Sequence, residues 1–171
     1  MRVFENTLAI VLSAAAVLWT LAAAAATPAE NLFYIARSTN ANIVRYDVRR
    51  KPDGRLDLHN PVDAYWLMNA QNGHREELTF LERHFAYGFS ATGVNPSGFS
   101  LRLTAFKQRE VHVELHNGRY RPRVFIASVQ ATLHRIYVKT DGGGALPHVQ
   151  YVELRGTTDS GTEVVERINA P

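Results

Sequence analysis

The sequence predicts a mainly β domain, closed either as an antiparallel barrel or as a two-sheet sandwich, with eight or nine strands and one α-helix. Most segments alternate apolar and polar residues and are rich in β-branched and aromatic side chains, which is the pattern of half-buried strands. Short turn signals separate the segments, and short connections favour antiparallel neighbours. A sheet with this many strands must close or fold over to bury one face, and the sequence leaves both closures open.

The first strands lie near the start of the predicted domain. Residues 31–37 (NLFYIAR) and 43–48 are rich in β-branched and aromatic residues, and the second segment alternates as a strand does. Residues 51–54 (KPDG) predict a turn, because proline presets one backbone dihedral and glycine accepts positive φ. A third strand is predicted over residues 62–68 (VDAYWLM), and the Asn-Gly pair at 72–73 ends it.

One helix is predicted over residues 76–88, and a long loop follows it. Glu76 and Glu77 fall in the first turn, where negative charge is favourable, and Gly88 ends the helix. The apolar residues that recur at helical spacing are Leu78, Leu81 and Phe85. Residues 90–100 show no periodicity, so we expect a loop there, and loops of this length often border a functional site.

The rest of the chain has a regular β rhythm. Strands are predicted over residues 101–106, 110–116, 120–127, 133–139, 148–154 and 163–168. The Asn-Gly pair at 117–118 is a hairpin signal, because a type I′ turn needs positive φ at both central residues. Polar, glycine-containing segments at 141–144 and 157–161 separate the last three strands.

Residues 1–26 are predicted to be a cleaved export signal. Arg2 gives a positively charged start, residues 8–26 are uncharged and rich in Leu, Val and Ala, and Ala24-Ala25-Ala26 offers small residues at the cleavage site. We expect cleavage before Thr27, which leaves residues 27–171 as a single β-rich domain with no stable membrane span, in the periplasm or secreted. The alternative is an uncleaved membrane anchor, since an uncharged run of this length could cross a bilayer.

Composition excludes several kinds of chemistry. The 171 residues contain no cysteine, which excludes disulfides, thiol catalysis, thiolate zinc sites and iron–sulfur clusters. The sequence has no phosphate-binding loop, dinucleotide glycine motif, nucleophile elbow or His-Glu-x-x-His motif, and we expect no cofactor. A net charge of +3 is modest and, together with export, disfavours nucleic acid as a partner. Residues 100–140 hold eight Lys or Arg against two Glu, so a basic face is expected.

Six residues from the first three strands and their connections form a candidate small-ligand site. They are Arg37, Asn40, Asn42, Tyr46, Tyr65 and Trp66. Arginine offers a fork to a carboxylate or phosphate, asparagine donates and accepts hydrogen bonds, and aromatic faces hold apolar or sugar-like rings. The alternative is structural: asparagines often satisfy backbone groups in a tight hairpin, and aromatic residues in strands usually belong to the core.

His112, Glu114 and His116 alternate with apolar residues, which places their side chains on one face of a strand. Imidazole and carboxylate ligate zinc, but residues two apart on a strand are about 7 Å apart, so three from one straight strand cannot converge on one ion. A solvated face is the favoured interpretation, and no metal site is predicted. The Asp-Ser-Gly triplet at 159–161 resembles an aspartic protease motif, but a hairpin turn explains it better, because that chemistry needs two carboxylates.

Three arginines share one face of a predicted strand and form a candidate binding site for an envelope polyanion. They are Arg119, Arg121 and Arg123. Pro122 between them cannot donate a ladder hydrogen bond, so we expect an edge strand or a bulge. The alternative is an intramolecular ion-pair ladder with Glu110 and Glu114 on the preceding strand.

Several stretches of the chain resemble a known family. They are NLFYIARSTNANIVRYDV at 31–48, GRLDLHNPVDAYWL at 54–67, LERHFAYG at 81–88, and RIYVKT with PHVQYVEL between 135 and 154. Together they resemble a bacterial exported family designated domain of unknown function 4833, and the likeness covers nearly all of the predicted mature chain. The resemblance implies a signal-bearing envelope protein with one domain, and it implies no reaction, cofactor or catalytic residue.

We therefore expect an exported cell-envelope domain that is a non-enzymatic ligand- or partner-binding protein. Export, the β architecture, the basic face and the lack of a complete catalytic motif favour this function. The alternatives are a small envelope hydrolase that uses carboxylates or histidines from scattered strands, and a structural accessory of an envelope complex. A ligand-sized pocket would favour binding, whereas two convergent titratable groups in a cleft would favour catalysis.

Overall fold

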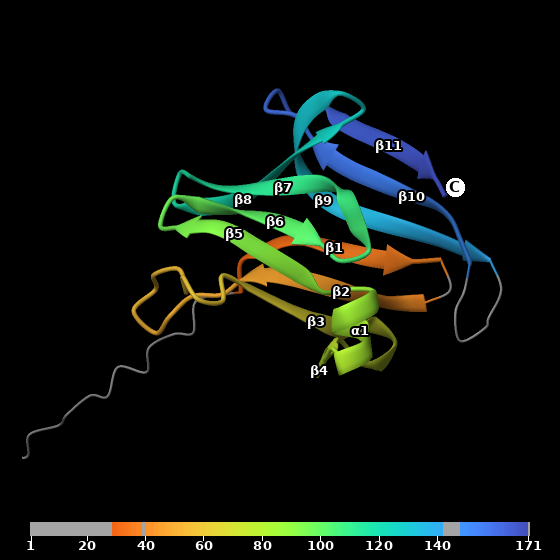
Figure 1. Ribbon diagram of the computed structural model, residues 1–171, viewed down its shortest axis with the longest axis horizontal. Helices are drawn as coiled ribbons and strands as arrows, with labels where there is room; N and C mark the ends of the chain where they lie inside the picture. The colour runs from red at the N-terminus through yellow and green to blue at the C-terminus, as the bar shows by residue number, and fades with distance from the viewer. Residues whose placement is uncertain (1–28, 39, 142–147, 171) are drawn as a thin grey trace, which may run out of the picture.

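The computed structural model describes residues 29–38, 40–141 and 148–170, and its fold is mainly β, as predicted (Figure 1). The predicted export signal lies outside these residues. The described strands are β1 (Asn31–Arg37), β2 (Asn40–Val48), β3 (Val62–Met68), β4 (His74–Glu77), β5 (Phe89–Asn95), β6 (Gly98–Leu103), β7 (Phe106–His116), β8 (Arg119–Ile126), β9 (Val129–Asp141), β10 (His148–Thr157) and β11 (Glu163–Asn169). The helical elements in this part of the chain are a 3₁₀ turn at Asn69–Gln71 and the short helix α1 (Phe80–Phe85), and neither could cross a membrane.

All eleven described strands belong to one curled sheet (Figure 1). The strand order is β4-β3-β2-β1-β9-β8-β7-β6-β5, and β10 pairs with both β9 and β11. The sheet forms a half-barrel, because β4 and β5 lie at the two ends of this order and do not pair with each other. The sequence left barrel and sandwich open, and the structure has a single sheet that folds over on itself.

The long strand β9 joins the two halves of the sheet. One of its edges pairs with β10 in antiparallel register. The other edge pairs first with β8, up to Thr132, and then with β1, from Arg135 to Val138. The β1–β9 pairing is parallel, but these strands lie far apart in the sequence; the paired strands that follow one another along the chain are antiparallel, as expected. Because β8 and β1 share one edge of β9, the strands β1–β4 and β5–β8 can fold over a common core.

The core lies between these two halves. Phe33 and Tyr46 stand opposite each other on β1 and β2, are fully buried, and stack with ring centroids 4.6 Å apart. Tyr46 also meets Phe89 of β5 edge to face at 6.1 Å, so the halves are in direct contact. Leu101 of β6 and Leu133 of β9 are fully buried as well. Burying a large apolar side chain contributes about 1.5–3 kcal/mol, so these inward-facing positions stabilise the fold strongly.

The predicted helix is wrong in its start and its length. Glu76 belongs to β4, which pairs with β3. The helix begins later because Thr79 caps it: the Thr79 hydroxyl accepts from the Glu82 N–H at 3.3 Å, and the Glu82 carboxylate accepts from the Thr79 N–H at 2.8 Å. Leu81 and Phe85, two of the apolar residues at helical spacing, are 64% and 75% exposed.

The loop predicted over residues 90–100 is also wrong, because most of these residues form the β5–β6 hairpin. The Asn95 side chain accepts from the Ser97 N–H at 2.8 Å and closes the turn. β5 lies at the end of the strand order, and none of its side chains is fully buried. Small and polar residues are sufficient at such a position, so the apolar alternation that identifies a strand is missing there.

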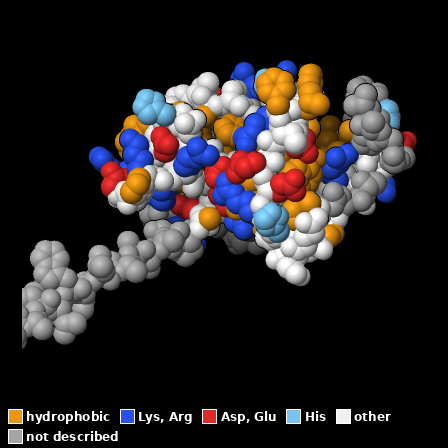
Figure 2. Space-filling view, turned by 90° about the horizontal axis from the view of Figure 1, so that it is seen from below, with side chains coloured by type: hydrophobic (Ala, Val, Ile, Leu, Met, Phe, Trp, Pro, Cys, Tyr) orange, Lys and Arg blue, Asp and Glu red, His pale blue; other side chains and the backbone are white. Residues whose placement is uncertain are grey.

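Charged side chains of both signs lie next to one another on the face shown in Figure 2. A chain of ion pairs runs from the residue after β2 across β3 and β4 to α1 and joins Arg49, Asp63, Arg75, Glu77 and Arg83, with distances of 2.8–2.9 Å. Burial alone would raise the pKa of Asp63, but hydrogen bonds from Arg75 and Arg49 outweigh it and lower the pKa. Exposed ion pairs of this kind contribute about 0–1 kcal/mol each, so they add little to the stability of the fold.

Candidate functional site

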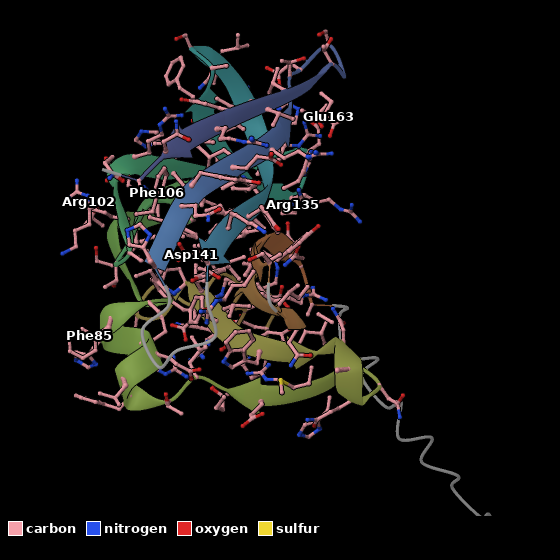
Figure 3. All side chains as sticks on the ribbon, turned by 90° about the vertical axis from the view of Figure 1, so that its right-hand side faces the viewer. Phe85, Arg102, Phe106, Arg135, Asp141 and Glu163 are labelled. Atoms are coloured by element: carbon pink, nitrogen blue, oxygen red, sulfur yellow. The ribbon has the colours of Figure 1, made fainter. Side chains whose placement is uncertain are left out.

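An apolar groove lies at one end of the half-barrel. Its volume of about 510 Å³ is within the range of small-molecule sites. Phe85 of α1 and Phe106 of β7, both labelled in Figure 3, line it from different elements. Apolar residues of five further strands complete it; these include Ile35, Leu103, Ile136, Val138, Val152 and Ile168.

Arg37 brings a positive charge into this groove. It is the last residue of β1, and its Nη1 donates to the Tyr87 hydroxyl at 3.2 Å. In the described part of the chain no carboxylate forms an ion pair with Arg37. Burial raises the pKa of Tyr87 above its ordinary value, although the Arg37 guanidinium partly opposes this, so the hydroxyl is neutral at pH 7. An unpaired guanidinium beside an apolar surface suits a ligand with an anionic group.

Two of the predicted ligand residues belong to the core. Tyr46 is fully buried, and its hydroxyl donates to the Tyr87 carbonyl at 2.7 Å. Burial, reinforced by the nearby Tyr87, raises the pKa of Tyr46 far above its ordinary value. The Trp66 indole N–H donates to the Glu82 carboxylate at 3.0 Å, and its ring packs edge to face on Tyr87 at 5.1 Å. These contacts hold the segment after α1 against the sheet and leave no aromatic face for a ligand.

Two more of the predicted ligand residues, Tyr65 and Asn42, also lie away from the groove. Tyr65 is on the outer face of β3, where its hydroxyl donates to Asp47 at 2.6 Å and Arg75 covers its ring at 4.0 Å. Burial and the hydrogen bond to Asp47 raise the pKa of Tyr65 to about 12. Asn42 is buried, and its side-chain oxygen accepts from the Ala70 N–H at 3.1 Å. The Asn40 side chain lies outside the described residues. Of the six candidates, Arg37 alone is described as lining the groove.

The candidate metal residues and the candidate anion-binding residues share one surface. The β7–β8 register pairs His116 with Arg119, Glu114 with Arg121, and His112 with Arg123. Directly opposite residues project from the same face of a sheet, so the two sequence patterns form one outer face. No group of three His, Cys, Asp or Glu among the described residues could hold a metal ion. His112 Nδ1 instead lies 3.0 Å from the Ser100 hydroxyl.

The structure divides the three arginines into two kinds. Arg123 is only 7% exposed, and its guanidinium donates to Asp159 at 2.6 and 2.9 Å and to the Thr132 hydroxyl at 3.0 Å. The hydrogen bonds from Arg123 lower the pKa of Asp159. Arg119 and Arg121 are exposed, and neither forms an ion pair with a carboxylate of the described residues. Arg123 is therefore structural, and the other two remain candidates for binding an anion.

The alternative ion-pair ladder across β7 and β8 does not form within the described residues. Glu110 lies 3.8 Å from Arg102 of β6, and Glu114 makes no ion pair there. The strand that carries Pro122 is also not an edge strand, because β8 pairs with β7 on one side and with β9 on the other. Its ladder with β9 begins at Arg123, directly after the proline, so Pro122 lies where β8 pairs with β7 but not yet with β9.

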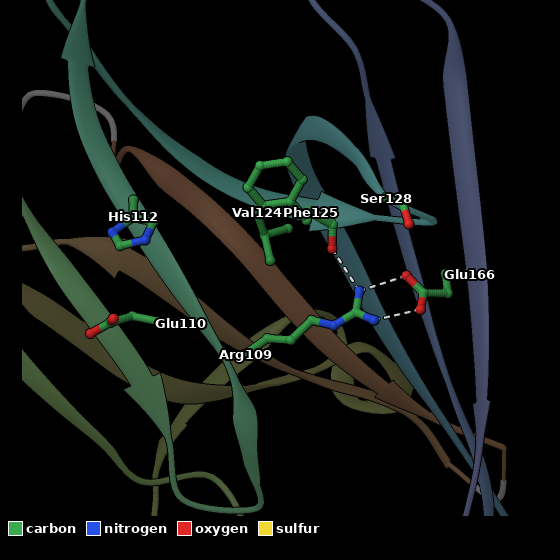
Figure 4. Close-up of a pocket in the computed structure, with 7 residues that line it drawn as sticks. All are labelled: Arg109, Glu110, His112, Val124, Phe125, Ser128 and Glu166. Atoms are coloured by element: carbon green, nitrogen blue, oxygen red, sulfur yellow. Dashed lines mark hydrogen bonds and ion pairs between the residues drawn. The ribbon is translucent and has the colours of Figure 1, made fainter.

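A second pocket is lined by a structural ion pair (Figure 4). Arg109 of β7 donates two hydrogen bonds to the Glu166 carboxylate of β11 and a third to the Phe125 carbonyl at 2.6 Å. Glu166 also accepts from the Ala127 N–H. The hydrogen bonds from Arg109 lower the pKa of Glu166 and raise that of Arg109 itself. Because these charges are paired within the protein, the cluster ties β7 and β8 to β11.

We expect low pH to weaken the ion pair between Arg109 and Glu166. The pKa of Glu166 is below its unfolded value of about 4.3, so its stabilisation is complete above that value and is lost as the pH falls through the lowered pKa. Wild type should be more stable than Glu166→Gln at pH 7, and the two free energies of unfolding should converge as the pH falls through the lowered pKa of Glu166, as measured by urea unfolding at each pH. A difference that stays constant over this range would contradict the assignment.

Most groove residues carry no distinctive signal in the sequence. Val138, Val152 and Ile168 come from three strands, and the sequence places each of them only within a predicted strand. The curl of the sheet gathers them, and periodicity along one strand does not reveal that curl. The β7–β8 surface did have a signal, because a two-residue turn at 117–118 fixes the register of the hairpin and so places His116 opposite Arg119.

Fold and groove together define a mainly β half-barrel domain with a ligand-sized apolar site. The chain belongs to the family described as domain of unknown function (DUF4833), whose family model matches residues 33–167. Comparisons with curated proteins and with solved structures gave no match. The family description names no activity, so function has to be argued from the geometry of this chain.

Proposed function

We propose that this chain is a non-enzymatic binding domain of the cell envelope, and that its end groove holds a single-chain amphiphile. The apolar chain lies along Ile136, Val138 and Val152, and an anionic head group meets Arg37. The observation that carries the proposal is the groove itself, an apolar space of about 510 Å³ whose lining includes a guanidinium that forms no ion pair with a carboxylate of the described residues.

The physical chemistry of the groove favours this class of ligand. Each methylene removed from water contributes about 0.8 kcal/mol, so a chain of ordinary length gains enough free energy for specific binding. The Arg37 guanidinium can donate two parallel hydrogen bonds to a carboxylate or phosphate oxygen pair. The neutral Tyr87 hydroxyl holds this guanidinium, which reduces the side-chain ordering that binding would otherwise require.

The envelope location rests on the sequence of the first 26 residues. An apolar run ending in Ala24-Ala25-Ala26 supports export and cleavage. Mass spectrometry of the protein from its native host should find a chain that begins at or near Thr27 in the soluble envelope fraction. An intact residue 1 in the membrane fraction would contradict this location.

A hydrolase is the alternative, and one contact is relevant to it. Ser100 and His112 lie within hydrogen-bond distance, as a nucleophile and its base would. This pair is on the outer face of β6 and β7, where His112 is exposed, and it does not line the apolar groove. The groove and the Ser100–His112 pair therefore do not make one site, and binding is the better supported function.

Substitutions in the groove test the proposal through the binding of a fluorescent acyl carboxylate. Val138→Asp places a carboxylate among apolar lining residues and should weaken binding about 10-fold or more, because a charge there loses its hydration. Val165→Asp is the matched control, since Val165 is 42% exposed on β11 and lies outside the groove. Equal affinities of the two variants would contradict binding in the groove.

The head-group contact has its own test. Arg37→Met keeps an apolar stem and removes the charge, so it should weaken binding of the carboxylate about 10-fold or more, as expected for a hydrogen bond to a charged group. Binding of the neutral alcohol with the same chain should stay unchanged. Arg102→Met, at an exposed position outside the groove, is the control. Equal losses of affinity for the carboxylate and the alcohol would show that Arg37 does not bind the head group.

A further inference from the structure

A third cavity, a cleft with a volume of about 650 Å³, lies where β8 and β1 separate along the shared edge of β9. The β8–β9 ladder begins at Arg123, and the parallel β1–β9 ladder begins at the Tyr34–Arg135 pair. Pro122, which has no N–H to offer β9, stands at the end of the first ladder. The opening between the two ladders therefore follows from the strand register, and connecting residues such as Arg50 and Gly54 complete its wall.

Arg119 and Arg121 line this cleft together with His134 and Thr132. Both arginines are exposed, and within the described chain neither has a carboxylate at ion-pair distance. The charge of Arg121 contributes to lowering the pKa of Asp159, but the Asp159 carboxylate forms its hydrogen bonds with Arg123. The two guanidinium groups therefore keep their hydrogen-bonding capacity for something outside the chain.

Glu30 also lines the cleft, and both of its carboxylate oxygens already accept hydrogen bonds within the protein. Glu30 accepts from the Tyr120 N–H and from Arg50 Nη2, each at 2.6 Å. Arg50 also donates to the Gly54 carbonyl at 2.9 Å. These bonds fix one wall of the cleft, and they neutralise Glu30 without involving Arg119, so the net charge of the lining side chains stays positive.

We propose that this cleft binds a multiply charged phosphate group, with Arg119 and Arg121 each pairing with phosphate oxygens. Side chains two apart on a strand are about 7 Å apart, so two guanidinium groups can hold adjacent phosphates of a diphosphate or both sides of one larger anion. The cleft uses the start of β1 and residues 132–134 of β9, whereas the groove uses later residues of both strands. The two sites are separate, so an experiment can refute the proposal for one site without refuting the proposal for the other.

The probe is inorganic pyrophosphate, titrated calorimetrically at low ionic strength. Wild type should bind it, and the double variant Arg119→Ser/Arg121→Ser should lose at least about 10-fold in affinity and show a weaker salt dependence. The control Arg102→Ser/Lys107→Ser removes the same charge from exposed positions outside the cleft and should bind as wild type does. Absence of binding to wild type, or equal losses in both double variants, would overturn the proposal.

Vesicles separate the two sources of such a phosphate. If a lipid head group is the ligand, phosphatidic acid vesicles should carry wild type and the control upward in a flotation gradient but not the Arg119→Ser/Arg121→Ser variant. If a soluble phosphate ester is the ligand, pyrophosphate should bind and the vesicles should not. Both arginines are exposed, so the melting temperature should remain nearly unchanged in the double variant. A large fall in melting temperature would instead assign Arg119 and Arg121 a structural role.

Discussion

Replacing Phe33 by alanine should lower the free energy of unfolding by about 3–5 kcal/mol, the cost of removing a large buried aromatic side chain. Phe33 is 0% exposed, and its ring stacks on Tyr46 at 4.6 Å between the two halves of the sheet. The cavity cannot close by local collapse, because Tyr46 is also fixed by its hydrogen bond to the Tyr87 carbonyl. Urea unfolding followed by circular dichroism measures the effect.

Phe125→Ala is the control for this substitution. Phe125 is 60% exposed on β8, so the same change of residue should alter stability by no more than about 0.5 kcal/mol. Similar losses for the two variants would mean that Phe33 does not hold the halves of the sheet together.

Gly156→Ala should destabilise the protein by about 3 kcal/mol, because the added methyl group collides with atoms that cannot move freely. A Cβ at Gly156 would lie 2.4 Å from the Thr132 carbonyl oxygen and 2.8 Å from Ile126 Cδ1. This is the point where β8, β9 and β10 crowd together, and the β9–β10 register is irregular there. The glycine therefore permits the close strand contact on which the half-barrel depends.

Gly161→Ala separates this steric effect from the general effect of replacing a glycine. Gly161 lies in a turn with a φ of +84°, and a Cβ there would meet nothing within 4 Å. Only backbone strain is expected, about 1 kcal/mol. A Gly156 variant that is no less stable than the Gly161 variant in thermal unfolding would contradict the crowding.

Strands could be predicted from the sequence wherever burial of one face imposes an alternating pattern. The predicted bounds of β1 and β3 agree with the structure, because both strands have apolar inward faces and end at recognisable turns. β5 was missed because an end strand without fully buried side chains needs no such pattern. The helix was placed too early because Glu76 and Glu77 fit a first helical turn, whereas the Thr79–Glu82 capping box sets the true start.

The candidate site was predictable only in part, and the reason is physical. A guanidinium at the end of a strand beside a hairpin is visible in the sequence, and Arg37 was found in this way. Most of its apolar partners come from other elements, far along the chain, and no spacing rule connects Arg37 with Val138 or Ile168. Tyr46 and Trp66 were predicted as ligand contacts, but both are held by hydrogen bonds inside the core.

Binding of a chain-length series measures the central claim most directly. Straight-chain carboxylates of increasing length, each kept below its micelle concentration, are titrated into the protein in a calorimeter. Affinity should rise about fourfold per methylene, as expected for about 0.8 kcal/mol each, and then stop rising when the groove of about 510 Å³ is full. Val138→Asp should abolish the rise. An affinity that does not depend on chain length in wild type would contradict a groove that binds an amphiphile.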